Sequence, residues 1–125
     1  MTRKILVVDD SIAIGRQLTK ILQEEIGGYE VVGHAKNGAE AVMLFKSLKP
    51  DVVLMDIVMP MMDCLQALRA LTKLDPKAKV VVVSSVGGVG QTVEEALRLG
   101  ALSVVSKPFE SAKIKATLDR IFLEE

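Results

Sequence analysis

The chain has 125 residues, half of them apolar, with sixteen basic and sixteen acidic side chains and one cysteine. This arithmetic predicts a single globular domain over residues 1–125 and excludes a chain that is mainly disordered. Zero net charge and few aromatic residues argue against direct nucleic-acid binding, and the absence of a long apolar run argues against membrane insertion. Together with the single cysteine, these features indicate a cytoplasmic protein.

The predicted elements alternate along the chain. Short apolar runs, most of them rich in β-branched residues, predict strands at 5–8, 31–32, 52–55, 80–83 and 102–105. Apolar residues at three- or four-residue spacing predict helices around 14–22, 41–48, 65–71, 93–97 and 114–121. Glycine and proline residues separate these segments, so the order of elements is (βα)5.

Strict alternation of strand and helix with short links predicts right-handed crossovers and a parallel sheet covered on both faces. The expected fold is a three-layer α/β sandwich of the flavodoxin-like class with strand order 2-1-3-4-5. A barrel is excluded, because it needs about eight repeats and roughly 250 residues. In open sheets of this kind the functional crevice lies beyond the carboxyl ends of the strands.

Polar residues follow four of the five predicted strands. Asp9 and Asp10 follow the first strand, Asp56 the third, Ser84 the fourth and Lys107 the fifth. Because the carboxyl ends of parallel strands share one edge of the sheet, these side chains are expected to converge. The second strand contributes no comparable group.

Carboxylates that converge in one crevice repel one another unless a cation lies among them, so the pattern predicts a metal. Oxygen ligands favour Mg²⁺, whereas zinc is disfavoured because His34 and Cys64 have no partner ligands. His34 is interpreted as a solvated residue at a strand end. A competing interpretation is that Asp9 or Asp10 merely caps the helix that begins near Ser11. Helix capping does not account for Asp56 or Lys107.

An aspartate beside a divalent cation and a lysine can act as a nucleophile towards phosphorus, because both cations neutralise the phosphoryl oxygens. The product is an acyl phosphate. Ser84 is the candidate hydroxyl for a hydrogen bond to a phosphoryl oxygen, with Ser85 as the alternative. Either serine can also simply end a strand by local hydrogen bonding.

Several short motifs, spread over residues 4–122, together resemble a known family. They are Val7-Val8-Asp9-Asp10-Ser11, Ala35-Lys36-Asn37-Gly38, Pro50-Asp51, Met55-Asp56-Ile57-Val58-Met59-Pro60, Met62-Asp63, Gly100-Ala101 and Lys107-Pro108-Phe109. The chain resembles the receiver domain of two-component response regulators and, within that family, the single-domain chemotaxis regulators of the CheY-like kind.

The resemblance implies a role for each acidic residue. Asp56 corresponds to the phosphoacceptor, Asp10 to a direct Mg²⁺ ligand and Asp9 to a ligand that acts mostly through water. The backbone carbonyl of Val58 corresponds to a third protein contact of the ion. The implied activity is Mg²⁺-dependent self-phosphorylation at Asp56.

The resemblance also implies a switch and its partners. Ser84 corresponds to the switch hydroxyl and Lys107 to the lysine that contacts the phosphoryl group, with a cis bond between Lys107 and Pro108. The phosphodonor is the phosphohistidine of a sensor kinase, the output is binding to a downstream protein, and a separate phosphatase is a further expected partner.

Val104 stands where the family usually has an aromatic residue, so a rotamer switch that couples Ser84 to an aromatic ring is not expected. The candidate element to move instead is residues 86–90, in which three glycines leave the backbone with few constraints. Phosphorylation is expected to order this segment and to slow amide hydrogen exchange across residues 86–92. Unchanged exchange rates would contradict the hypothesis.

Val58 and Val86 each lie two residues after a predicted site residue, where they flank the expected route of the attacking water. Apolar side chains cannot orient that water, so self-dephosphorylation is expected to be slow. Replacing Val58 with Asn or Glu is expected to shorten the lifetime of the phosphorylated form, which can be followed by intact mass. An unchanged lifetime would show that water access at this position is not limiting.

Cys64 stands where the family usually has glycine. Two interpretations stay open: a strained turn, if the position needs a positive φ, or a turn that differs from that of the family.

Alternatives to the switch also remain. The chain could be an interaction module with this fold that is never phosphorylated, or the receiver fragment of a larger regulator. An aspartate-nucleophile phosphatase is disfavoured, because such an enzyme needs a second carboxylate two residues after the nucleophile, where this chain has Val58.

Overall fold

The computed structural model describes residues 2–57, 61–84 and 90–123. Predictions that rest on Val58, Ser85 and residues 86–89 therefore lie outside the described residues.

The described elements alternate as predicted. In chain order they are β1 (Arg3–Val8), α1 (Ile12–Lys20), the π-helical turn η1 (Ile21–Ile26), β2 (Tyr29–Ala35), α2 (Gly38–Leu48), β3 (Val52–Asp56), α3 (Met61–Leu74), β4 (Val80–Ser84), α4 (Gly90–Arg98), β5 (Ser103–Ser106) and α5 (Ser111–Leu123). The strands form one parallel sheet in the order β2-β1-β3-β4-β5, which confirms the predicted flavodoxin-like topology.

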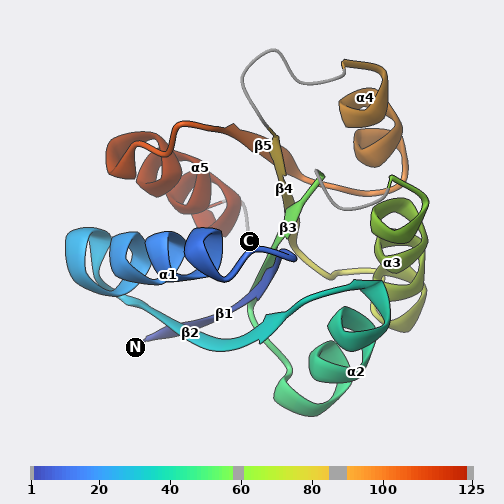
Figure 1. Ribbon diagram of the computed structural model, residues 1–125, viewed down its shortest axis with the longest axis horizontal. Helices are drawn as coiled ribbons and strands as arrows, with labels where there is room; N and C mark the ends of the chain where they lie inside the picture. Colours follow the sequence, from blue (N-terminus) through green and yellow to red (C-terminus); the bar gives the residue numbers. More distant parts are fainter. Residues whose placement is uncertain (1, 58–60, 85–89, 124–125) are drawn as a thin grey trace.

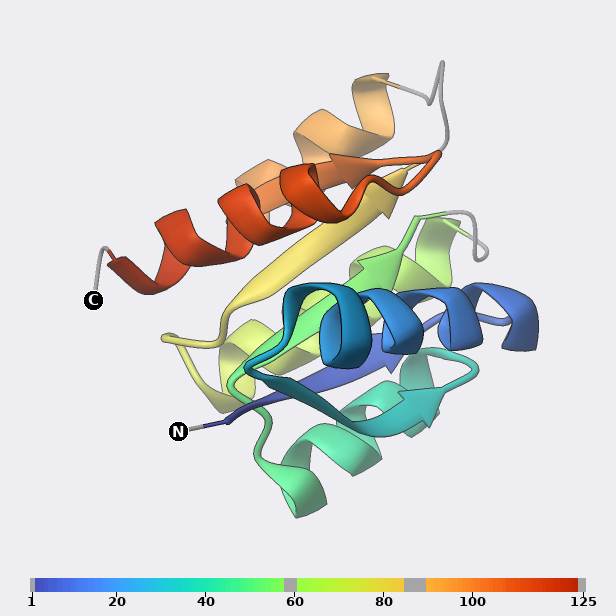
Figure 2. The same cartoon turned by 90° about the vertical axis from the view of Figure 1, so that its left-hand side faces the viewer.

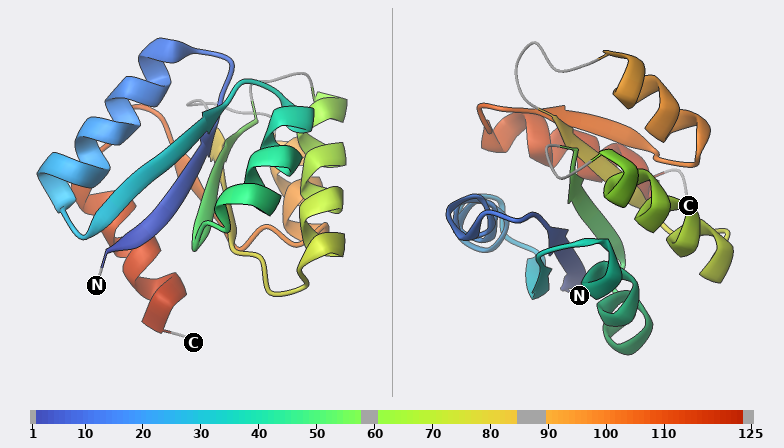
Figure 3. Two further views of the ribbon diagram at one scale, coloured as in Figure 1. Left: turned by 90° about the horizontal axis from the view of Figure 1, so that it is seen from below. Right: turned by 45° about the vertical axis from the view of Figure 1, so that its right-hand side comes forward.

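Helices cover both faces of the sheet, α1 and α5 on one side and α2, α3 and α4 on the other (Figures 1 and 3). Every residue of β3 and β4 is buried, as expected for central strands of a doubly covered sheet. The pleat sends alternate side chains to opposite layers: Ile5 packs with the residues under α1 and α5, and Leu6 with those under α2, α3 and α4.

The second strand differs most from its prediction. It runs for seven residues, whereas only Val31 and Val32 were apolar enough to indicate it. It is an edge strand with a bulge, since Ile5 pairs with Val31 and Leu6 with Gly33. The helix before it ends in the π-helical turn η1, from which Gln23 Oε1 accepts a hydrogen bond from the Val31 N–H at 2.9 Å.

Cys64 is fully buried near the start of α3 and has a helical backbone. The strained-turn interpretation is therefore wrong: among the described residues, Lys49 is the one non-glycine residue with a positive φ. Cys64 packs with Leu68 and Val82 in the apolar layer on that face of the sheet.

The carboxyl ends of all five strands lie at one end of the molecule (Figure 2). The topology thus brings together the segments that follow β1, β3 and β5. None of the helices in the described part of the chain is long and apolar enough to cross a membrane.

Candidate functional site

Two buried aspartates occupy the carboxyl ends of the neighbouring strands β1 and β3. Val8 pairs with Met55, so the next residue on each strand is an aspartate, Asp9 and Asp56. Their exposed fractions are 1% and 2%. The parallel pairing of two apolar strands therefore places two carboxyl groups side by side inside the protein.

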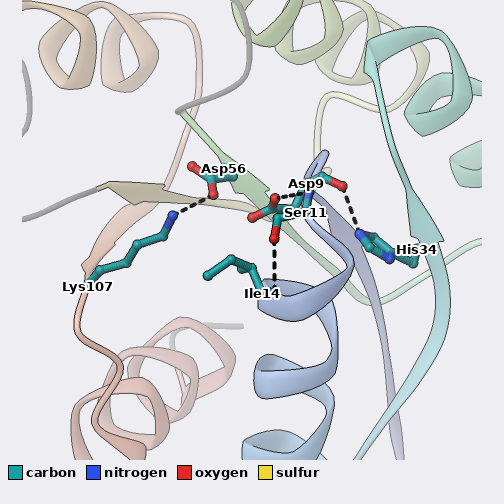
Figure 4. Close-up of polar contacts among 6 residues, drawn as sticks. All are labelled: Asp9, Ser11, Ile14, His34, Asp56 and Lys107. Carbon is teal, nitrogen blue, oxygen red and sulfur yellow. Dashed lines mark hydrogen bonds and ion pairs between the residues drawn. The ribbon is translucent and has the colours of Figure 1, made fainter.

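Lys107 reaches this pair from beyond β5. Its Nζ lies 2.9 Å from Asp56 Oδ2, and 22% of the lysine side chain is exposed (Figure 4). The Lys107 N–H also donates to the Ser84 carbonyl at 2.8 Å, which ties the lysine to the end of β4. The peptide bond between Lys107 and Pro108 is cis, as the family resemblance implied.

The electrostatics of the pair are dominated by burial. Burial, followed by hydrogen bonding with the adjoining Asp56 carboxyl and by charge repulsion from it, raises the pKa of Asp9 from 3.8 to about 7. This value already includes the opposing effects of the Ser11 N–H and the Lys107 ammonium, which lower the same pKa. Asp9 Oδ2 is buried and has no hydrogen-bond partner among the described residues.

The other predicted site residues differ in their exposure to solvent. Ser84 is buried at the end of β4, whereas Asp10 is exposed. Within the described ranges, no three His, Cys, Asp or Glu side chains are arranged as a preformed metal cluster. The structure thus brings together two of the three predicted carboxylates and the lysine, while Val58 and Ser85 are not described.

The start of α1 settles the competing interpretation of the acidic residues. Ser11 is the N-cap, and its Oγ accepts a hydrogen bond from the Ile14 N–H at 3.3 Å. Asp9 Oδ1 instead accepts from the Ser11 N–H at 2.7 Å, one residue before the helix begins. The interpretation that Asp9 or Asp10 caps this helix is therefore wrong.

His34, on β2, is a residue of this site that sequence analysis missed. Its Nε2 lies 2.8 Å from the Asp9 carbonyl oxygen (Figure 4), and the side chain is half-buried, so the interpretation of His34 as a solvated residue missed this contact. The available signal was Gly15, which lies inside the predicted helix 14–22 at its second residue, because a glycine in a helix often has a packing reason.

The acidic pair has the chemistry of a hard-cation site. Both buried residues offer carboxylate oxygens, the donors that Mg²⁺ prefers, and the unpartnered Asp9 Oδ2 is available to such an ion. A divalent cation would also remove the repulsion that raises the pKa of Asp9. Within this pair, the Asp56 carboxylate held by Lys107 can act as a nucleophile towards the phosphorus of an anionic phosphoryl group.

Comparison with known proteins identifies the family. The response regulator receiver domain matches residues 5–119. Chemotaxis protein CheY of Thermotoga maritima is 39% identical over 121 residues, which cover 97% of this chain and 98% of that protein. A protein-glutamate methylesterase/protein-glutamine glutaminase of Photobacterium profundum is 42% identical over 110 residues, or 88% of this chain and 28% of that protein.

Among solved structures, the complex of CheX and CheY with BeF3 and Mg²⁺ from Borrelia burgdorferi has a chain that is 34% identical, with a TM-score of 0.85. The match covers 96% of this chain and 89% of that one. Both the sequence motifs and the strand order lead to the same assignment. The chain therefore belongs to the family of response regulator receiver domains.

Proposed function

We propose that Asp56 is the phosphoacceptor of this phosphorylation-activated switch of two-component signalling. The observation that carries the proposal is the ion pair in which Lys107 Nζ lies 2.9 Å from Oδ2 of the buried Asp56. The lysine is a fixed positive charge at the point where a phosphoryl group on Asp56 would add negative charge. The second buried carboxyl, Asp9, lies beside it.

The proposed reaction is a phosphoryl transfer from nitrogen to oxygen. A carboxylate oxygen of Asp56 forms a bond to phosphorus while the phosphorus–nitrogen bond of a phosphohistidine breaks. The imidazole keeps the bonding electron pair and leaves neutral when its other ring nitrogen carries a proton. Lys107 neutralises charge on the transferred phosphoryl oxygens, and Ser84 is the proposed hydroxyl that binds one of them.

Mg²⁺ is the proposed cofactor of this site. Asp9, Asp10, Asp56 and the backbone carbonyl of Val58 are its proposed protein contacts. The buried and unpartnered Asp9 Oδ2 supports this, as does the Mg²⁺ in the solved complex of the Borrelia burgdorferi relative. When bound, the ion would supply positive charge, in addition to that of Lys107, for the oxygens of the phosphoryl group.

The proposed partners follow from the family. They are a histidine sensor kinase as phosphodonor, a downstream protein that reads the phosphorylated surface, and a separate phosphatase. The relatives named chemotaxis protein CheY support a role in chemotaxis. A cytoplasmic location is part of the same proposal. Residues 1–125 are proposed to act as one receiver domain, and the match to part of a methylesterase keeps the fragment of a larger regulator as the alternative.

The proposal is tested with the purified protein and a small phosphodonor such as acetyl phosphate, with and without Mg²⁺. Intact mass should increase by one phosphoryl group only when Mg²⁺ is present, and hydroxylamine should remove the group, as expected for an acyl phosphate. No mass increase under any of these conditions would favour the interaction module that is never phosphorylated.

A further inference from the structure

The backbone of Asp9 is held by β2 through both of its polar groups. The Asp9 N–H donates to the Ala35 carbonyl at 2.9 Å, and the Asp9 carbonyl lies 2.8 Å from His34 Nε2. Because a carbonyl can only accept, Nε2 carries the hydrogen in this bond. With Asp9 Oδ1 accepting from the Ser11 N–H, these contacts fix the orientation of the remaining oxygen, Oδ2, beside Asp56.

The His34 ring lies directly against Gly15 of α1. A Cβ atom at position 15 would lie 2.7 Å from His34 Cε1 and 2.9 Å from Nδ1, both closer than real contacts allow. Glycine is disfavoured inside a helix relative to alanine, so its presence here agrees with a need for this close approach. The helix therefore presents a notch that fits the imidazole and sets its position.

The other side of the imidazole faces a groove. This groove of about 450 Å³ runs between α1 and β2 and is lined by Gly15, His34, Val7, Gln23 and Val31, among others. Shortening the His34 side chain would enlarge an open groove and would not leave a sealed cavity in the core. The folded structure should consequently tolerate substitution at this position.

We propose that His34 is a positioning residue for the acidic site: its hydrogen bond to the Asp9 carbonyl, with the ring seated on Gly15, orients the Asp9 carboxylate for Mg²⁺ binding beside Asp56. The inference rests on the proposed function, because it assigns a role to His34 only if this site binds Mg²⁺. Groups that orient metal ligands from outside the coordination shell commonly change metal affinity by about 10- to 100-fold when they are removed.

The test is the Mg²⁺ affinity of the full chain, measured by calorimetry without any phosphodonor. His34→Ala is expected to weaken binding by about tenfold. His34→Gln should restore most of the affinity, because its side-chain amide can donate to the same carbonyl. Gln23→Ala is the matched control: it alters the same groove and leaves the Asp9 carbonyl contact intact, so its affinity should equal that of the wild type.

Gly15→Ala provides a second test that does not alter the histidine. Its added methyl group should displace the ring and weaken Mg²⁺ binding in the wild-type background. In the His34→Ala background the same change should leave the affinity unaltered and raise the melting temperature, since alanine is the better helix former.

The outcomes separate the two proposals. If the wild type binds Mg²⁺ and His34→Ala binds it equally well, the positioning role is wrong and the proposed function stands. The positioning role is also wrong if His34→Gln is as weak as His34→Ala, or if Gln23→Ala loses as much affinity. Failure of the wild type itself to bind Mg²⁺ would contradict the proposed function, and with it the inference.

Discussion

Asp56→Asn is expected to abolish phosphoryl uptake, with a loss on the order of 10⁴-fold or more, the range seen when a reacting side chain is removed from an enzyme. Asparagine has nearly the same shape as aspartate, but its amide carries no negative charge and is a poor nucleophile. The change also removes one of two adjoining buried carboxyls. The folded structure should therefore persist while the chemistry stops.

The measurement is the rate of mass increase with acetyl phosphate and Mg²⁺. Asp75→Asn is a suitable control, because Asp75 is exposed and its Oδ1 accepts a hydrogen bond from the Lys77 N–H that an asparagine can also accept. This control should be phosphorylated at the wild-type rate. Uptake by Asp56→Asn at the wild-type rate would mean that another residue receives the phosphoryl group.

The sequence was sufficient to predict the fold because the central strands are almost uniformly apolar. The apolar side chains of residues 52–55 and 80–83 can all be buried only in a sheet that is covered on both faces. The alternation of these strands with helices then requires parallel pairing. The edge strand β2 was predicted poorly, since five of its seven residues are partly or fully exposed and a bulge interrupts its pairing.

The site was predictable to the extent that topology alone determines it. Asp9, Asp56 and Lys107 follow strand ends, so the strand order brings them to one edge of the sheet. Details that depend on side-chain packing were missed. The exposure of Asp10, the choice of Ser11 as helix cap and the contact of His34 with Asp9 depend on how α1 sits against β1 and β2, which periodicity does not encode.

Asp9→Asn is expected to stabilise the metal-free protein at pH 8 relative to the wild type, and to have a much smaller effect at pH 5. Burial raises the pKa of Asp9 in the folded state to about 7, above its ordinary value of 3.8. Between these two values the folded state binds more protons than the unfolded state, so the free energy of unfolding falls as the pH rises. The contribution is complete below pH 3.8 and is lost as the pH rises through about 7.

Asparagine is neutral at every pH and removes this dependence. The linkage spans about two decades of proton affinity between pH 5 and the folded pKa, and each decade corresponds to about 1.4 kcal/mol, so the advantage of Asp9→Asn should be about 3 kcal/mol larger at pH 8 than at pH 5. Urea unfolding in the presence of a chelator measures this difference. Asp75→Asn, at an exposed position, should show no such change between the two pH values.

Mg²⁺ should offset the advantage of Asp9→Asn at pH 8. An ion that binds only the folded state stabilises it by about 2.7 kcal/mol at a concentration 100 times its dissociation constant. The wild type should gain this stabilisation, whereas Asp9→Asn, which keeps only the Asp56 carboxylate of the acidic pair, should gain much less. Equal stabilisation of both proteins by Mg²⁺ would place the ion away from Asp9. A wild-type free energy of unfolding that is the same at pH 5 and pH 8 would show that the buried Asp9 carboxyl does not titrate in this range.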